Sequence, residues 1–273
     1  MARGQNLEVG LIGLGSMGSY VAREILAGKV PGVKLTAAAD IKSPPSDLLH
    51  DLESHSVALV ESYERLADYP LKLVIECANQ KAVKECARFF ITKRMDLLVM
   101  SVGALVQGSL FSDLAAAAEE GGCRIYIPSG AVGAIDALQA AKLGGLKEVS
   151  LTTRKPPRSL GNVEGLNLEG LKEPRILFEG PATEAVEKFP QNVNVAATIS
   201  LAGLGPEKTM VRVLADPGID QNIHEIRARG AFGSLEIRLA NFPNPDNPKT
   251  SLLSCLSVIA LLKRIEGTVQ LGS

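Results

Sequence analysis

The chain has 273 residues, of which 46% are hydrophobic, and its 29 basic and 30 acidic residues leave a net charge of −1. Domains usually contain about 100–200 residues, so this length allows two domains, each with a well-filled core. Because the basic residues form no long run, we expect neither nucleic acid nor an anionic membrane as a partner.

The N-terminal segment and the cysteines indicate the cytoplasm. MARGQNLE lacks the apolar core of a signal peptide, and the apolar stretch 252–262 is too short to cross a bilayer. No C-x-x-C spacing occurs among the four cysteines, which are Cys77, Cys86, Cys123 and Cys255. We therefore expect buried thiols, without a disulfide framework or a metal site.

A glycine-rich turn near the N-terminus is the most informative motif. Gly13, Gly15 and Gly18 form G-x-G-x-x-G between an apolar run and a segment with apolar residues at helical spacing. The first glycine permits the turn, the second lets the backbone approach a pyrophosphate, and the third lets helix and strand pack closely. The helix N-terminus, at Ser16 and Met17, offers N–H groups to phosphates. The motif predicts dinucleotide binding, and a purely structural glycine turn is the alternative.

An acidic residue ends the second predicted strand. Residues 33–40, VKLTAAAD, read as a strand that ends at Asp40, about 20 residues beyond the glycines. A carboxylate at this place can accept a hydrogen bond from the 2′-hydroxyl of the adenosine ribose and repel a 2′-phosphate. Lys42 can neutralise part of that charge, so we expect NAD as the preferred cofactor and NADP as a tolerated one.

Apolar strands alternate with helical patterns in the first half of the chain. Strands are predicted at 73–77, 96–101 and 124–127, and helical segments at 48–52, 63–66, 80–93 and 110–120. This alternation predicts a parallel sheet with helices on both faces. We expect an α/β, Rossmann-type dinucleotide-binding domain over residues 1–131.

Loops at the carboxyl ends of parallel strands form the ligand site of such a sheet. Three of these loops are small or polar and begin at Ala78, Ser101 and Pro128. Small side chains let backbone groups approach a ribose and a nicotinamide, so we expect Ala78 and Ser101 to contact the cofactor. Ordinary glycine-rich turns are the alternative.

The pattern changes after about residue 145. Strands are predicted at 147–154, 176–179, 210–215, 223–229 and 235–241, with a Pro- and Gly-rich connection at 155–173. The spacing of the last three strands indicates antiparallel pairs with one polar face. The Ala-rich part of 189–203 reads as a helix that begins near Asn192 or Asn194. We expect an α+β domain for substrate binding and dimerisation over residues 132–246.

A terminal helix is predicted over 247–264, beginning with NPKTS. Its apolar face can return to the first domain, so we assign 247–273 to that domain. The sheet of the second domain has a wide apolar face and only this one helix to cover it, which indicates that another subunit covers part of the face.

Three histidines occur in the chain. His50 and His55 lie in a polar stretch and read as surface residues. His224 begins a strand after a turn rich in Asp, Pro and Gly, a position from which an imidazole can reach a cleft. Its ordinary pKa of about 6.5 suits a general acid/base. A partly buried histidine satisfied by the backbone is the alternative.

Seven segments, in this order along residues 9–262, resemble the NAD(P)-dependent L-aspartate dehydrogenase family. They are GLIGLGSMG, VMSVGAL, RIYIPSGAVGAIDAL, SLTTRKPP, FPQNVNVAATISLAG, NIHEIRARGAFG and NPKTS. The resemblance implies that His224 is catalytic and that Ala131 and Asn194 contact the cofactor, with Asn192 as the alternative register. The loop KPPRSLGNVEGLNLEGLKEPR departs from the family, which leaves the substrate loop open.

The resemblance further implies a homodimer that oxidises L-aspartate reversibly through iminosuccinate to oxaloacetate and ammonia, and that supplies iminoaspartate for NAD biosynthesis. The amine must be neutral before hydride leaves Cα, so a base is needed near His224. A dicarboxylate also needs cations, and Arg154, Lys155 and Lys249 are the candidates. For each of them a solvated surface cation is the alternative.

Two other functions share these features. One is a different two-domain reductase that acts on an imine or a semialdehyde. The other is a non-catalytic protein that binds NAD(H) and senses its redox state, for which the first domain would suffice.

Overall fold

The computed structural model describes residues 6–160, 168, 170–189, 194–244 and 247–271. These residues form two compact units. The first unit contains the chain up to Ala104, then Gly108–Pro128 and Cys255–Leu271. The second contains Leu105–Gln107 and Ser129–Ser254.

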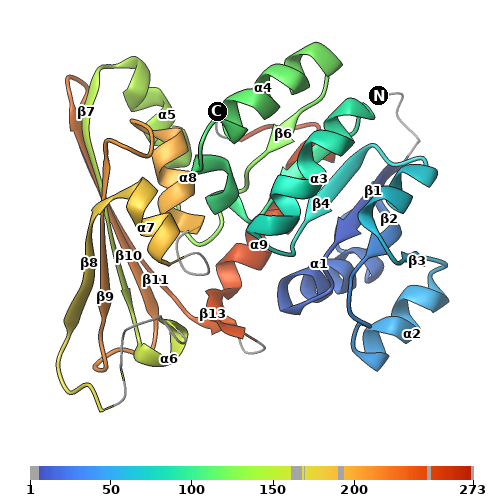
Figure 1. The fold of residues 1–273 in the computed structure, drawn as a ribbon, viewed down its shortest axis with the longest axis horizontal. Helices are drawn as coiled ribbons and strands as arrows, with labels where there is room; N and C mark the ends of the chain where they lie inside the picture. Colours follow the sequence, from blue (N-terminus) through green and yellow to red (C-terminus); the bar gives the residue numbers. More distant parts are fainter. Residues whose placement is uncertain (1–5, 161–167, 169, 190–193, 245–246, 272–273) are drawn as a thin grey trace. The chain divides into compact units, whose positions relative to one another are not determined.

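The first unit is built on a six-stranded sheet in the order β3-β2-β1-β4-β5-β6, all of whose pairs are parallel (Figure 1). The strands are β1 (Leu7–Ile12), β2 (Val33–Ala39), β3 (Ala58–Val60), β4 (Leu73–Glu76), β5 (Asp96–Val99) and β6 (Ile125–Tyr126). The helices are α1 (Ser16–Leu26), α2 (Ser46–Ser54), η1 (Tyr63–Asp68), α3 (Gln80–Thr92), η2 (Val102–Val106) and α4 (Leu110–Gly121). The predicted parallel sheet is confirmed. Its strand order changes direction between β1 and β4, and ligands bind at such a switch point.

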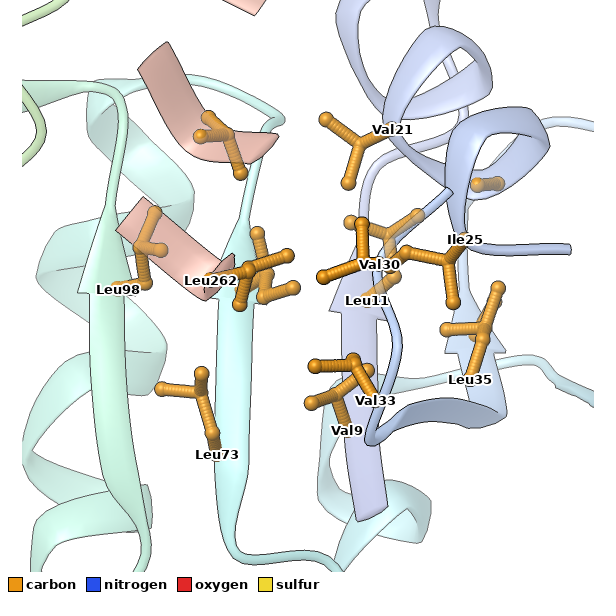
Figure 2. Close-up of a cluster of buried hydrophobic side chains, with 14 of the residues drawn as sticks. Val9, Leu11, Val21, Ile25, Val30, Val33, Leu35, Leu73, Leu98 and Leu262 are labelled. Atoms are coloured by element: carbon orange, nitrogen blue, oxygen red, sulfur yellow. The ribbon is translucent and has the colours of Figure 1, made fainter. Parts of the chain in front are cut away.

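The last helix completes the core of this unit. Helix α9 (Leu252–Glu266) places Val258, Ile259, Leu261 and Leu262 in one apolar cluster with residues of β1, α1, β4 and β5. Figure 2 shows Leu262 in this cluster with Leu98 of β5. The predicted return of the terminal helix to the first domain is confirmed.

Leu262→Ala is expected to lower the free energy of unfolding by about 2–5 kcal/mol, because it removes fully buried methyl groups and leaves a cavity. The matched control is Leu256→Ala on the same helix, where the side chain is 41% exposed and the change should stay within about 0.5 kcal/mol. Equilibrium urea denaturation measures both variants. Equal effects would contradict the packing of α9 on this core.

The second unit is built on a five-stranded sheet in the order β11-β10-β7-β9-β8. The strands are β7 (Leu146–Lys155), β8 (Arg175–Pro181), β9 (Thr209–Ala215), β10 (Asn222–Gly230) and β11 (Gly233–Asn241). The helices are α5 (Ile135–Leu143), α6 (Pro157–Leu160), α7 (Ala182–Lys188) and α8 (Asn194–Ala202). The α+β class is confirmed, and α8 covers the Ala-rich segment for which a helix is predicted.

The expected pairing of the last three strands is only half right. Strands β10 and β11 form an antiparallel pair, but β9 does not pair with β10, because β7 lies between them and pairs with both. The connection 216–221 can span roughly 20 Å, whereas strands two places apart are separated by only about 10 Å. The chain can therefore pass over β7 before it forms β10.

The start of the terminal helix is also placed differently from the prediction. NPKTS forms the strand β13 (Asn247–Ser251), which pairs with β12 (Pro243–Asn244), and α9 begins only at Leu252. Pro248 has no N–H group, and a residue before a proline prefers an extended conformation. Both properties suit a strand at this point.

The two faces of the second sheet differ in character. Helices α5, α7 and α8 contact β7 and β9 along the apolar face (Figure 1). The other face carries the ion pairs Arg227–Glu236, Arg238–Glu225 and Arg212–Glu179, as expected for a polar face. The expectation that only the terminal helix is available to cover the apolar face is wrong, because α5, α7 and α8 contact this face. The sequence patterns do not predict α5 and α7.

Candidate active site

The three motif glycines have different roles in the structure. Gly13 has φ +88°, and a Cβ on it would lie 2.8 Å from the Cα of Ala78. A Cβ on Gly18 would lie 1.8 Å from the carbonyl oxygen of Gly13. A Cβ on Gly15 would meet nothing within 4 Å. The first and third glycines therefore allow close packing, and the second faces open space that a phosphate can approach.

The N-terminus of α1 fits a pyrophosphate. Its N-cap is Gly15, which supplies no side-chain cap, and the first turn carries no acidic residue. The hydroxyl of Ser16 is buried and has no hydrogen-bond partner in the described part of the chain, so a phosphate oxygen would satisfy it. Met17 packs against the apolar cluster. The residues present thus fit a dinucleotide.

Asp40 lies next to the same turn. Its Oδ2 accepts a hydrogen bond from the backbone N–H of Leu14, and its Oδ1 accepts one from the backbone N–H of Lys42. A carboxylate oxygen has more than one lone pair, so ribose hydroxyls can still donate to this group. The carboxylate therefore couples the end of β2 to the glycine turn.

Ala78 and Ser101 follow the neighbouring parallel strands β4 and β5. The side chain of Glu76, the last residue of β4, accepts hydrogen bonds from both of them. Sequence patterns do not single out Glu76, because a single acid in the run LVIEC reads only as a break in an apolar strand. A carboxylate at the end of a buried strand was the available signal.

Polar residues gather on the helix-covered face of the second sheet. Thr153, Lys155, Asn222, His224 and Asn241 form this group, which we term the polar cluster, and all of them are buried. His224 lies opposite Thr153, and Asn222 lies opposite Asn241. Successive strand residues alternate between faces, so Lys155 shares the face of Thr153, and Asn222 shares the face of His224.

Hydrogen bonds hold the members of the polar cluster. His224 Nδ1 lies 3.1 Å from Thr153 Oγ1. Asn241 Nδ2 donates to the carbonyl oxygen of Ala131 at 2.7 Å, so Ala131 is held next to the cluster. Asn222 Nδ2 donates to Ser251 Oγ, and Asn222 Oδ1 has no partner among the described residues.

Burial changes the proton affinities of this cluster. It lowers the pKa of Lys155 to about 8. Burial, together with the charge of Lys155, lowers the pKa of His224 to about 3. The pKa of His224 in this structure therefore lies well below the ordinary histidine value of about 6.5. At neutral pH His224 is uncharged. Of these two residues of the polar cluster, Lys155 has the pKa nearer to neutrality.

The other predicted site residues lie elsewhere or outside the description. Arg154 lies on the opposite face of β7 from Lys155 and forms an ion pair with Asp216 at 3.5 Å. Lys249 lies on β13, and its side chain is outside the described residues, as is all of Asn192. Asn194 is the first residue of α8. Of Arg154 and Lys155, the two predicted cations whose side chains are described, Lys155 alone shares the face of His224.

Two features are absent from the described residues. Within them, no helix is long and apolar enough to cross a membrane. Nor do their His, Cys, Asp and Glu side chains form any group of three or more that could hold a metal ion.

Known proteins resemble this chain along its whole length. It is 44% identical over 272 residues to L-aspartate dehydrogenase from Methanosarcina barkeri, covering 98% of this chain and 100% of the relative. It is 38% identical over 271 residues to L-aspartate dehydrogenase from Nitrosopumilus maritimus, covering 97% and 99%. The chain belongs to the aspartate dehydrogenase family.

Family models and solved structures agree with this membership of the aspartate dehydrogenase family. Residues 136–265 match the C-terminal model of aspartate dehydrogenase, and residues 13–128 match the NAD-binding domain of homoserine dehydrogenase. The crystal structure of aspartate dehydrogenase from Thermotoga maritima has a TM-score of 0.77 at 28% identity, covering 98% of this chain and 100% of that one. Scyllo-inositol dehydrogenase from Lactobacillus casei, 13% identical with a TM-score of 0.56, shares the fold. The resemblance to the aspartate dehydrogenase family, the two-part fold and the use of NAD(P) are confirmed.

Period-two spacing could have identified more of the polar cluster. Val149 and Leu151 mark the buried face of β7, so Thr153 and Lys155 follow on that face. The same spacing places Asn222 beside His224. Spacing does not predict that β7 pairs with β10, so it does not predict that Thr153 and Lys155 lie near Asn222 and His224.

Proposed function

We propose that this protein oxidises L-aspartate with NAD(P) to iminosuccinate, which water converts to oxaloacetate and ammonia, and that the reaction is reversible. The observation that carries the proposal is the buried polar cluster, in which Lys155 and His224 share one face of the second sheet. The chain's membership of the aspartate dehydrogenase family supports it. The bound nicotinamide supplies the hydride acceptor.

The polar cluster suits a dicarboxylate that carries an amine. The buried ammonium of Lys155 attracts a carboxylate, and the negative charge of the substrate raises the pKa values of both Lys155 and His224. Where His224 Nδ1 donates to Thr153, its Nε2 lone pair is left to accept a proton. Asn222 Oδ1 is placed on the same face to accept a hydrogen bond from the amine. Arg154, on the other face, is not part of this proposal.

The cofactor in this proposal takes most of its contacts from the first unit. Its pyrophosphate lies against Gly13, Gly15, Ser16, Met17 and Gly18, and its ribose hydroxyls lie at Asp40. Ala78 and Ser101 contact its nicotinamide half, together with Ala131 and Asn194. In this proposal residues 1–131 with 247–273 form the cofactor domain and 132–246 the substrate and dimerisation domain, whereas the compact units of the structure divide at Pro128 and at Cys255.

A cofactor-dependent assay tests the activity. NADH consumption is followed with oxaloacetate and ammonia, beside pyruvate and 2-oxoglutarate as controls. Turnover confined to oxaloacetate supports the proposal. Turnover of another imine or of a semialdehyde would instead make the protein a different two-domain reductase, and NADH binding without any turnover would make it a redox sensor.

Asp40→Ser is expected to lower the preference for NAD over NADP, measured as the ratio of kcat/KM values, by about 10-fold or more. The reason is that a carboxylate repels the 2′-phosphate of NADP and a hydroxyl does not. Asp47→Ser is the matched control, because Asp47 is an exposed acid on α2 that pairs with Arg23. An unchanged ratio in the Asp40 variant would remove the proposed role of this residue.

We also propose a cytoplasmic homodimer that supplies iminoaspartate for NAD biosynthesis, on the basis of the family. The four cysteines form no disulfide, as is usual in a reducing compartment. Light scattering at micromolar concentration should give twice the chain mass of 28.8 kDa. A monomeric mass would refute the dimer.

A further inference from the structure

Glu76 is a fully buried acid in the first unit. Its Oε1 accepts hydrogen bonds from the Ala78 N–H and the Ser101 hydroxyl, both at 2.8 Å. Its Oε2 accepts hydrogen bonds from the N–H groups of Ser101 at 3.0 Å and Met100 at 3.2 Å. One carboxylate thus joins the loop that follows β4 to the loop that follows β5.

This carboxylate is held by hydrogen bonds without an ion pair in the described residues. Burial raises the pKa of Glu76, because its effect exceeds that of the hydrogen bonds from Ser101, Ala78 and Met100, which lower the pKa. Burying a carboxylate costs several kcal/mol unless donors replace its water. An apolar residue would fill a strand end in a sheet core at no such cost, so the acid needs a reason beyond packing.

The first of the two loops that Glu76 joins, the loop after β4, is in contact with the glycine turn. Gly13 approaches Ala78 so closely that a Cβ on Gly13 would lie 2.9 Å from the Ala78 nitrogen, and that N–H group donates to Glu76. Glu76 makes hydrogen bonds to two loops at the carboxyl edge of the sheet, and the glycine turn packs against the first of them without a hydrogen bond to this side chain.

We propose that Glu76 is a positioning residue for the cofactor: its carboxylate holds the loops after β4 and β5 in the conformation that receives the nicotinamide half of the dinucleotide. The inference rests on the proposal that Ala78 and Ser101 contact the cofactor. Loops that are ordered before binding lose less conformational freedom on binding, which raises affinity.

Glutamine cannot replace this carboxylate in either orientation of its amide. With the NH₂ group at the Oε1 position, it faces the N–H of Ala78. With the NH₂ group at the Oε2 position, it faces the N–H groups of Ser101 and Met100. In both cases a backbone donor loses its acceptor, although the side chain keeps its size.

The test measures the affinities of NADH and ADP by titration calorimetry in wild type, Glu76→Gln and Asp96→Asn. Asp96 is the matched control, since its carboxylate also accepts a backbone N–H, from Arg124, but at the opposite end of β5. Glu76→Gln should weaken NADH binding by about 10-fold or more. ADP binding should change less than about twofold, because ADP reaches only the glycine turn and Asp40. Asp96→Asn should bind both as wild type does.

Several outcomes would overturn the inference. NADH affinity equal to wild type in folded Glu76→Gln would leave Glu76 a structural residue only, and an equal loss of NADH and ADP affinity would indicate general damage. These binding measurements need no aspartate. A failure of the proposed aspartate turnover in the wild type is therefore a separate result.

Hydrogen–deuterium exchange of the wild type covers the case in which Glu76→Gln does not fold. The amides of Ala78 and Ser101 should exchange slowly without cofactor, because the Glu76 carboxylate already holds them. Rapid exchange that slows only when NADH is added would contradict the inference.

Discussion

His224→Ala is expected to lower kcat for aspartate oxidation by about 10²–10⁴-fold, the usual contribution of a positioned proton-transfer group. NADH affinity should change little, because the proposed phosphate and ribose contacts come from the glycine turn and Asp40 in the other unit. Steady-state kinetics and NADH titration measure the two effects separately.

The control for this variant is His50→Ala, which removes an exposed histidine on α2 and should leave kcat unchanged. The melting temperature is measured beside the kinetics, so that loss of folding is distinguished from loss of chemistry. Near-normal turnover of a folded His224→Ala protein would make His224 a structural histidine. Proton transfer would then fall to Lys155, Lys249 or bound water.

Lys155→Met is expected to lower kcat/KM for aspartate by about 10²–10³-fold, because a buried carboxylate of the substrate would lose its cation. Lys147→Met is the matched control, since Lys147 is an exposed lysine on the same strand and should be replaceable. The melting temperature of Lys155→Met should not fall, because burial disfavours the charged form of Lys155 in the folded protein. A kcat/KM of Lys155→Met equal to that of wild type would contradict the proposed role of Lys155 in substrate binding.

The pH dependence of inhibition by succinate tests the same residue. Succinate is a dicarboxylate that does not titrate near pH 8. Burial lowers the pKa of Lys155 to about 8, so the cation is present below this pH and is lost above it. The Ki of succinate should therefore rise about 10-fold between pH 7 and pH 9.

The variants should separate the two titratable groups of the polar cluster. In His224→Ala the rise in Ki near pH 8 should persist, because burial and the charge of Lys155 lower the pKa of His224 to about 3. In Lys155→Met the Ki should be high and independent of pH over this range. If the rise in Ki near pH 8 disappeared in His224→Ala but persisted in Lys155→Met, the titrating group would be His224 and not Lys155.

The sequence by itself determined most of the first unit. The strand–turn–helix at Gly13–Gly18, the strand ending at Asp40 and the alternating strands and helices follow from local periodicity and turn chemistry. These signals depend only on neighbours along the chain. A parallel sheet also has few alternatives once strands and helices alternate, because crossovers are right-handed and both faces must be covered.

In the second unit, the local sequence pattern predicted where the long strands lie along the chain but not which strands pair with one another. Strand β7 inserts between β9 and β10, the short helices α5 and α7 cover the apolar face, and NPKTS becomes a strand. Short helices have weak periodicity, and pairing between distant strands depends on contacts far apart in sequence.

The tertiary structure alone decided the chemistry of the polar cluster. Lys155 and Arg154 are adjacent cations in the sequence, but only Lys155 shares the buried face of His224. Charged forms are disfavoured away from water, so the assembled sheet, and not the residue type, lowers the pKa values of Lys155 and His224. The role of Glu76 likewise became visible only when Ala78 and Ser101, distant in sequence, were found on one carboxylate. Burial and long-range hydrogen bonding are properties of the fold, and a local pattern does not contain them.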